Sequence, residues 1–175
     1  DPNKIAVIDT YSTGSDNTWD VEVSGEYAYI STEDKGLHIV DISSPSNCVP
    51  VGTYPRPGKI DDEEIVVRDR FAYLATYQLG FEIVDISDPK SPKPVGSYKD
   101  NTYYPYRISL YGNYAFLSYW GDGDMLKVID ISKPENPELR YTLKNSSYTT
   151  RIIIRNGYAY WVSGGEFRIY RVFNL

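Results

Sequence analysis

Four charged residues recur at matching positions along the chain, 44, 43 and 44 residues apart: Asp20, Glu64, Arg107 and Arg151. Two acids followed by two bases permit three kinds of chemistry. A pair of carboxylates is what a glycan-cleaving enzyme needs for its acid and its base or nucleophile. The four groups could instead neutralise one another in a ring of salt bridges, or line a polar binding site. Residue types alone leave these alternatives open.

Aromatic residues lie close to these charges in the sequence, and Tyr is abundant, with 18 Tyr against 5 Phe. Exposed aromatic rings beside carboxylates suit a sugar, whose apolar face stacks on a ring, or a protein surface, where Tyr and Trp anchor contacts. Single rings could also fill the core. The candidate ligand-binding residues are therefore Trp19, Asp20, Glu64, Tyr103, Tyr104, Tyr106, Arg107, Tyr119, Trp120 and Arg151.

Other catalytic chemistry has little support. His38 is the only histidine, and the matching positions hold Glu82, Lys127 and Arg168. A position that accepts all four types is predicted to be exposed to solvent, which argues against a His-based triad or a His-ligated zinc site. Cys48 is the only cysteine, so no disulfide forms within the chain, and we expect its thiol to be inert. We assign no catalytic residue and predict that the chain is not an enzyme.

Metal, nucleic acid and membrane binding are also disfavoured. Asp122 and Asp124 form a short acidic turn that could offer oxygen ligands to calcium, but the turn lacks the full calcium-loop pattern with its distal Glu. We expect no cofactor, with calcium at these two residues as the alternative. The net charge of −6 opposes binding to phosphate backbones and anionic membranes. No apolar run approaches the ~18 residues of a membrane span.

The charged positions belong to a repeat that covers the chain. An apolar run ending in Asp-Ile-Ser occupies residues 37–43, 81–87 and 126–132, with a degenerate copy at 167–172. A Tyr-Ala-Tyr-like run precedes each copy, and a proline-rich link with a short Val-Gly-Thr-Tyr-like run follows the first two. Each repeat is predicted to form four short strands, separated by turns rich in Gly, Asn and Asp. The first strand of each repeat is predicted at 21–24, 65–68, 108–111 and 152–155.

One aspartate recurs in every complete copy of the apolar run: Asp41, Asp85 and Asp130. A catalytic residue has no reason to recur in each repeat, whereas a structural one does. An Asp at a strand end can accept backbone N–H groups from the following turn. We therefore predict a structural role for all three.

Four strands in roughly 44 residues are typical of a β-propeller blade. The Ile-Val-Asp-Ile-Ser core, the prolines and the Val-Gly-Thr-Tyr run resemble the LVIVD-repeat family of β-propellers, which occurs in bacterial and archaeal surface and secreted proteins. The resemblance implies an all-β propeller and an extracellular or cell-surface location. It also implies that the first strands line a central channel, with the four charged residues at its mouth.

The chain is predicted to be one domain, residues 1–175, with blades at about 20–54, 64–98, 107–143 and 151–173 plus 1–11. Residues 1–11 align with residues 88–98, so they should form the last strand of a blade. Pairing this strand with residues 167–173 would complete a fourth four-stranded blade and close the ring, leaving no sheet edge exposed. The alternatives are two chains sharing an eight-bladed ring, or a fragment of a longer propeller.

The function expected from these features is that of a non-catalytic binding module. Loops around the channel would bind a protein or a glycan at the cell surface, without nucleic acid or membrane insertion. Two alternatives remain: a structural subunit that assembles with its own copies, and a glycan-acting enzyme using the carboxylates at the channel mouth. The sequence does not decide the oligomeric state.

Overall fold

The computed structural model describes residues 5–56, 63–76, 79–99, 104–120, 123–145, 149–163 and 165–172. These residues form fifteen β-strands and no helix. No helix among them could therefore cross a membrane. The all-β prediction is confirmed.

The strands form four antiparallel sheets in which neighbours in sequence are neighbours in space. Sheet 1 contains β1 (Thr18–Ser24), β2 (Tyr27–Thr32), β3 (Gly36–Asp41) and β4 (Val49–Tyr54). Sheet 2 contains β5 (Glu63–Arg68), β6 (Phe71–Thr76), β7 (Gly80–Asp85) and β8 (Lys93–Tyr98). Sheet 3 contains β9 (Tyr104–Tyr111), β10 (Tyr114–Trp120), β11 (Gly123–Asp130) and β12 (Glu138–Asn145). Sheet 4 has three strands, β13 (Thr149–Arg155), β14 (Tyr158–Ser163) and β15 (Glu166–Arg171).

The predicted turns join the first two strands of each sheet. A residue with positive φ sits in each turn: Gly25 at 59°, Asp69 at 56°, Gly112 at 54° and Asn156 at 52°. Gly, Asp and Asn are the residue types that adopt this conformation at least cost. The residue types in these turns therefore favour the hairpin that joins the first two strands of each sheet.

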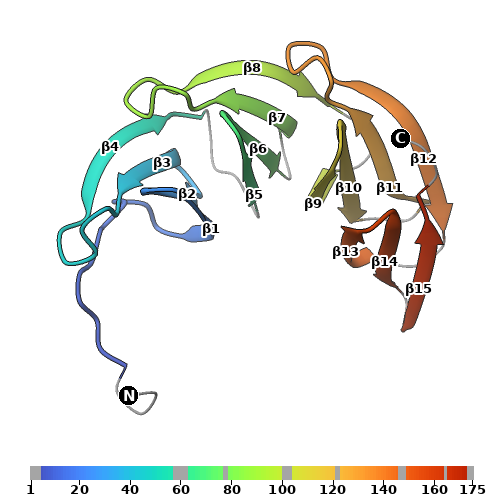
Figure 1. Ribbon diagram of the computed structural model, residues 1–175, viewed down its shortest axis with the longest axis horizontal. Coiled ribbons are helices and arrows are strands. Elements are labelled where there is room, and N and C mark those ends of the chain that lie inside the picture. The colour runs from blue at the N-terminus through green and yellow to red at the C-terminus, as the bar shows by residue number, and fades with distance from the viewer. Residues whose placement is uncertain are drawn as a thin grey trace.

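The sheets are arranged around an open arc (Figure 1). Their first strands, β1, β5, β9 and β13, lie on the concave side and pack in that order, while β4, β8 and β12 form the convex side. Each sheet has a forward face, which packs on the next sheet, and a rear face, which packs on the sheet before it. Apolar side chains fill the space between the two, as when Leu37 and Ile39 of sheet 1 pack on Ile65 and Leu74 of sheet 2.

Two glycines let the outer strands approach the following sheet closely. A Cβ on Gly52 would lie 2.1 Å from the carbonyl oxygen of Pro89, and one on Gly96 would lie 2.1 Å from that of Pro134. Both prolines belong to the link between the third and fourth strands of the next sheet. These two glycines thus mark the places where the backbone of an outer strand touches the backbone of the next sheet.

The contact between sheets 3 and 4 is built differently. Tyr141 pairs with Val128 in the register that Gly52 and Gly96 hold in their own sheets. Its side chain is 58% exposed. Trp161 is fully buried and packs with Phe116, Leu126 and Ile152. Aromatic packing here takes the place of the glycine contact.

The predicted closed ring of four four-stranded blades is not formed. The N-terminal segment (residues 5–11) contains no strand, and among the described residues nothing pairs with the outer edge of β15. Sheets 1 and 4 stand at opposite ends of the arc (Figure 1). The three sheet-to-sheet contacts turn the chain too little for its ends to meet.

The N-terminal segment instead lies against sheet 1. The Cys48 backbone N–H donates to Oδ2 of Asp9 at 2.6 Å, and the Tyr11 hydroxyl lies 2.8 Å from Nδ1 of His38. Hydrogen bonds from Cys48 and Thr10 lower the pKa of Asp9. Sheet 1 thus holds this segment through side-chain contacts and not through a β-ladder.

The structural role of the recurring aspartates is confirmed. Oδ1 of Asp41, Asp85 and Asp130 accepts the backbone N–H of the serine two residues later, at 2.8, 2.9 and 2.8 Å. The hydroxyl group of that serine, and then its backbone N–H, lower the pKa of each carboxyl group.

The predicted exposure is wrong for His38, Glu82 and Lys127, whereas the side chain of Arg168 is 33% exposed. His38 and Lys127 are only 7% and 5% exposed, and burial lowers the pKa of both. Glu82 pairs with Arg56, whose side chain is 1% exposed, at 3.1 Å. His38 meets Tyr11 of the N-terminal segment, and Glu82 meets Arg56 just after β4, so at these two positions the segment that precedes the sheet supplies a polar partner.

Candidate functional site on the concave side

The two acids of the candidate site bind the backbone of the neighbouring sheet. Oδ2 of Asp20, on β1, accepts the N–H of Ile65 on β5 at 2.9 Å. Glu64 repeats this contact one sheet further on, where its Oε2 accepts the N–H of Ile108 on β9. A carboxylate that accepts a backbone N–H satisfies a donor at the sheet edge. These acids therefore join successive first strands on the concave side.

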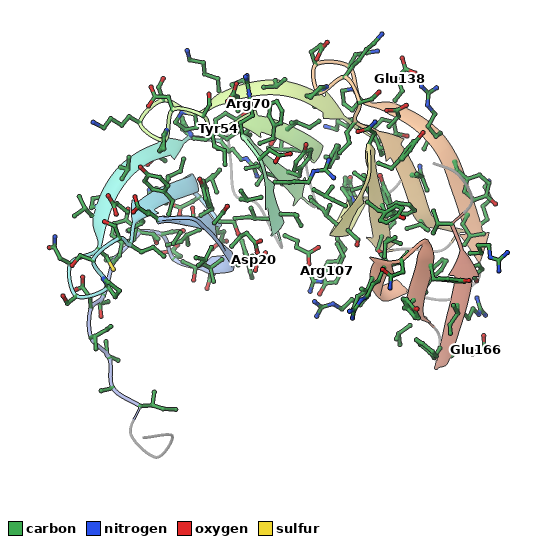
Figure 2. All side chains as sticks on the ribbon, in the orientation of Figure 1. Asp20, Tyr54, Arg70, Arg107, Glu138 and Glu166 are labelled. Atoms are coloured by element: carbon green, nitrogen blue, oxygen red, sulfur yellow. The ribbon has the colours of Figure 1, made fainter. Side chains whose placement is uncertain are left out.

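Arg107 occupies the third matching position but cannot accept an N–H. It folds onto its neighbour Tyr106 instead, with its guanidinium carbon 3.7 Å from the ring centroid. Its NH2 donates to the Tyr106 hydroxyl at 2.9 Å. Stacking of this kind fixes a guanidinium while leaving its outer edge free to bind. Figure 2 shows Asp20 and Arg107 on the concave side of the arc.

The salt-bridge ring considered from the sequence is not formed. Among the described side chains, no ion pair within 4.0 Å joins any two of Asp20, Glu64, Arg107 and Arg151. Arg151 is exposed at the sheet 4 end. The four charges form a row along the concave side, acidic at one end and basic at the other.

Glu64 has the most perturbed carboxyl group of this row. Burial raises its pKa to about 7, and the Ile108 N–H and Arg107 only partly oppose this rise. Its protonation state therefore changes near neutral pH. A buried carboxyl beside a fixed guanidinium can accept or donate a hydrogen bond to a ligand.

The aromatic candidates divide into two groups. Tyr104 and Tyr106 are half-buried and lie on β9, which begins earlier than the predicted strand, so they belong to the concave wall and not to a loop. Trp19 is 38% exposed and lines a shallow hollow of about 430 Å³ with Asp20 and Tyr11. Tyr119 is 1% exposed within the core, so its prediction as a ligand contact is wrong.

Several predicted residues are not placed by the structure. Tyr103 and Asp122 lie outside the described residues, and only the backbone of Trp120 and Asp124 is described, in β10 and β11. The calcium alternative at Asp122 and Asp124 is thus untested. Among the side chains that are described, no group of three His, Cys, Asp or Glu could hold a metal ion.

Sequence reasoning missed one cavity entirely. A volume of about 420 Å³ lies between sheets 3 and 4, lined mainly by apolar side chains that include Phe116, Leu143, Trp161 and Tyr170. Trp161 Nε1 is buried there without a hydrogen-bond partner. The substitution of Tyr141 for the recurring glycine was the sequence signal that this contact differs.

Solved structures with this fold are known. The chain is similar to the computationally designed Ika4 protein, with a TM-score of 0.75, 11% identity, and coverage of 97% of this chain and 99% of that one. It is also similar to the β-propeller domain of Cps50 (Swd1) from Myceliophteria thermophila, with a TM-score of 0.71, 13% identity, and coverage of 89% and 51%. The designed Ika8 protein matches with a TM-score of 0.70, 10% identity, and coverage of 89% and 46%. The fold is that of a β-propeller, and the chain spans about half the length of the last two proteins.

The family follows from the repeats themselves. The LVIVD repeat matches residues 15–55, 61–100 and 105–144, which correspond to sheets 1, 2 and 3 with their links. This chain belongs to the LVIVD-repeat family. Sheet 4 keeps the strand order and register of the repeat without matching its sequence. No curated protein matches the chain significantly.

Proposed function

We propose that this chain is a non-catalytic binding module that acts outside the cell, where its concave side binds a protein or a glycan. The observation that carries the proposal is the row of charges on the first strands. Glu64 and Arg107 lie on adjacent strands, and Arg107 is held by Tyr106 and not by an opposing acid. The guanidinium can therefore pair with a carboxylate or hydroxyl group of a partner.

Several features support binding over catalysis. Asp20 and Glu64 each accept a backbone N–H of the next sheet, so both are engaged in holding the strands together. A glycosidase needs two carboxyl groups that can both reach the sugar. Rings such as Tyr104 and Tyr106 beside the charges supply contact area at low entropic cost. The extracellular location is carried by the family resemblance.

The test is binding of the purified chain to a panel of polysaccharides and to cell-surface protein preparations. Replacing Arg107 by Ala should weaken binding at least tenfold, because the oriented cation is lost while the apolar core is untouched. Replacing Arg70 by Ala removes the same charge at the β5–β6 turn, away from the concave side (Figure 2), and should leave binding unchanged.

The outcome also separates the two partner classes, since binding to a polysaccharide or to a protein identifies the ligand chemistry. Circular dichroism checks that each variant keeps its sheets. Equal binding by the Arg107→Ala variant and the parent would contradict a site on the concave side.

A further inference from the structure

The forward face of sheet 4 is an apolar surface on which no other sheet of the described residues packs. Phe167 and Ile169 are 64% and 57% exposed, and Ile153 and Val162 extend the same face at 50% and 47%. The residues that match Phe167 and Ile169 in the preceding sheets are fully buried against the next sheet: Leu37, Ile39, Phe81 and Ile83. Sheet 4 therefore presents one complete half of a sheet-to-sheet contact.

The rear face of sheet 1 presents the other half. Val21 and Val23 are 57% and 58% exposed. Their counterparts on sheet 2, Ile65 and Val67, pack against the forward face of sheet 1. The two ends of the arc thus carry complementary halves of the contact that the repeat already makes between its sheets.

The N-terminal segment completes this complementarity. On sheet 1 it takes the place that β4 takes on sheet 2. Tyr11 contacts His38 on sheet 1, and Tyr54 contacts Glu82 on sheet 2 in the same way. Burial and then the Glu82 carboxylate raise the pKa of Tyr54. Asp9 meets the link after β3, as Gly52 meets the link after β7. The segment thus occupies an outer-strand position without a sheet of its own, whereas sheet 4 has no outer strand among the described residues.

We propose that sheet 4 of one copy packs on sheet 1 of a second copy, and that residues 5–11 of the second copy add along β15 as the missing fourth strand. Two such contacts close two chains into one ring of eight sheets. The contact cannot form within one chain without altering the other three, because these leave sheets 1 and 4 at opposite ends of the arc (Figure 1).

The repeat also fixes the register of the added strand. In sheets 1 and 2 the outer strand places Tyr54 opposite Leu37 and Tyr98 opposite Phe81, followed by Thr53 opposite His38. Transferred to the new pair, Tyr11 lies opposite Phe167 and Thr10 opposite Arg168. The row of charges would continue from Arg151 of one copy to Asp20 of the other, although association does not require the ligand proposed above.

Disulfide trapping tests both the register and the identity of the partner. In a Cys48→Ser background, one protein carries Thr10→Cys and another carries Arg168→Cys. On mixing and mild oxidation they should form a covalent heterodimer, because directly opposite residues in a β-pair bring their Cβ atoms within about 5 Å. A mismatched mixture of Thr10→Cys with Arg155→Cys, at the end of β13, should not cross-link.

Native mass spectrometry gives an independent readout. The parent chain should appear at twice its 20.0 kDa mass. Replacing Ile169 by Asp should weaken the dimer at least tenfold, because the charge would be buried in the new contact. Leu139→Asp is the matched control on β12 of sheet 3, which takes no part in the proposed contact; the side chain is 42% exposed, and this variant should remain dimeric.

Three results would overturn the proposal. A monomer at tens of micromolar would show that the apolar ends stay open. A chain carrying both cysteines that cross-links as a monomer would show closure within one copy. An unlimited series of masses would show an open filament in place of a ring.

Discussion

The contacts between sheets 1 and 2 and between sheets 2 and 3 resemble each other, whereas the contact between sheets 3 and 4 does not. The first two combine a glycine against a proline carbonyl with a carboxylate that binds the next strand's N–H. The third has Tyr141 and Arg107 at these positions and contains a half-open pocket of about 420 Å³. The difference indicates that backbone contacts add to apolar packing between the regular repeats, whereas the last contact relies on apolar packing with large aromatic side chains such as Trp161.

Trp161→Ala should have the largest effect on stability. This ring is fully buried in the third contact, beside an existing cavity, so the space it leaves cannot be refilled easily. We expect the free energy of unfolding to fall by about 4 kcal/mol, which urea denaturation would measure. Trp19→Ala, at a 38% exposed ring, is the control and should cost much less. Equal losses would show that the third contact does not depend on Trp161.

Gly96→Ala should come next. The added methyl would meet the Pro134 carbonyl oxygen at 2.1 Å, and both groups belong to backbone that cannot rotate away. The expected loss is about 2–3 kcal/mol in the same assay. Tyr141→Ala changes the matching position of sheet 3, where a Cβ is already present, and should cost less than 1 kcal/mol. Equal losses of unfolding free energy in the two variants would contradict the difference between the sheet 2–3 contact and the sheet 3–4 contact.

The Glu64 contact should make stability depend on pH. Its pKa is about 7 in the folded state and 4.5 as the unperturbed value, so the ionised form is disfavoured by folding. The free energy of unfolding of the parent, relative to that of Glu64→Gln, should therefore be greatest below pH 4.5. This difference should fall by up to about 3 kcal/mol as pH rises through 7. Urea denaturation at pH 4.5 and pH 8 measures this. A constant difference between parent and variant would disprove the shifted pKa.

Asp85→Ala should have the smallest effect. The substitution removes an acceptor for the Ser87 N–H and a partner of Arg70, both near the surface. A loss of about 1 kcal/mol is expected, since the freed N–H can bind water. Thermal unfolding of Asp85→Ala beside Asp130→Ala would show similar shifts, because both aspartates make the same turn. A loss approaching that of Trp161→Ala would mean that these turns, and not the apolar faces, hold the sheets.

Much of the fold could be predicted from the sequence because the repeat is local. The turn conformations at Asp69 and Asn156 are determined by a few neighbouring residues. The same holds for the hydrogen bond between Asp85 and the turn that follows it. Closure of the ring could not be predicted in the same way. It depends on the rotation summed over all sheet-to-sheet contacts, and no single residue specifies that sum.

The candidate site was predicted only in part, for related reasons. The period of the repeat placed Asp20, Glu64 and Arg107 correctly on the concave side. It failed for Tyr119, because β10 is an inner strand that is buried on both faces from Ala115 to Tyr119, and for His38, whose varied counterparts suggested exposure. Variation at a position indicates solvent exposure only when no neighbouring segment varies with it, and here the preceding segment supplies Tyr11 for His38 and Arg56 for Glu82.

That variable position affects how the chain avoids misfolding. Similar repeats risk docking in the wrong order, since any outer strand could settle on any sheet. An outer strand of sheet 1 that skipped one sheet would carry Arg56 toward buried Lys127 in place of Glu82, and two cations would share a site shielded from water. The Arg56–Glu82 pair therefore favours docking of the outer end of sheet 1 on sheet 2 over docking on sheet 3.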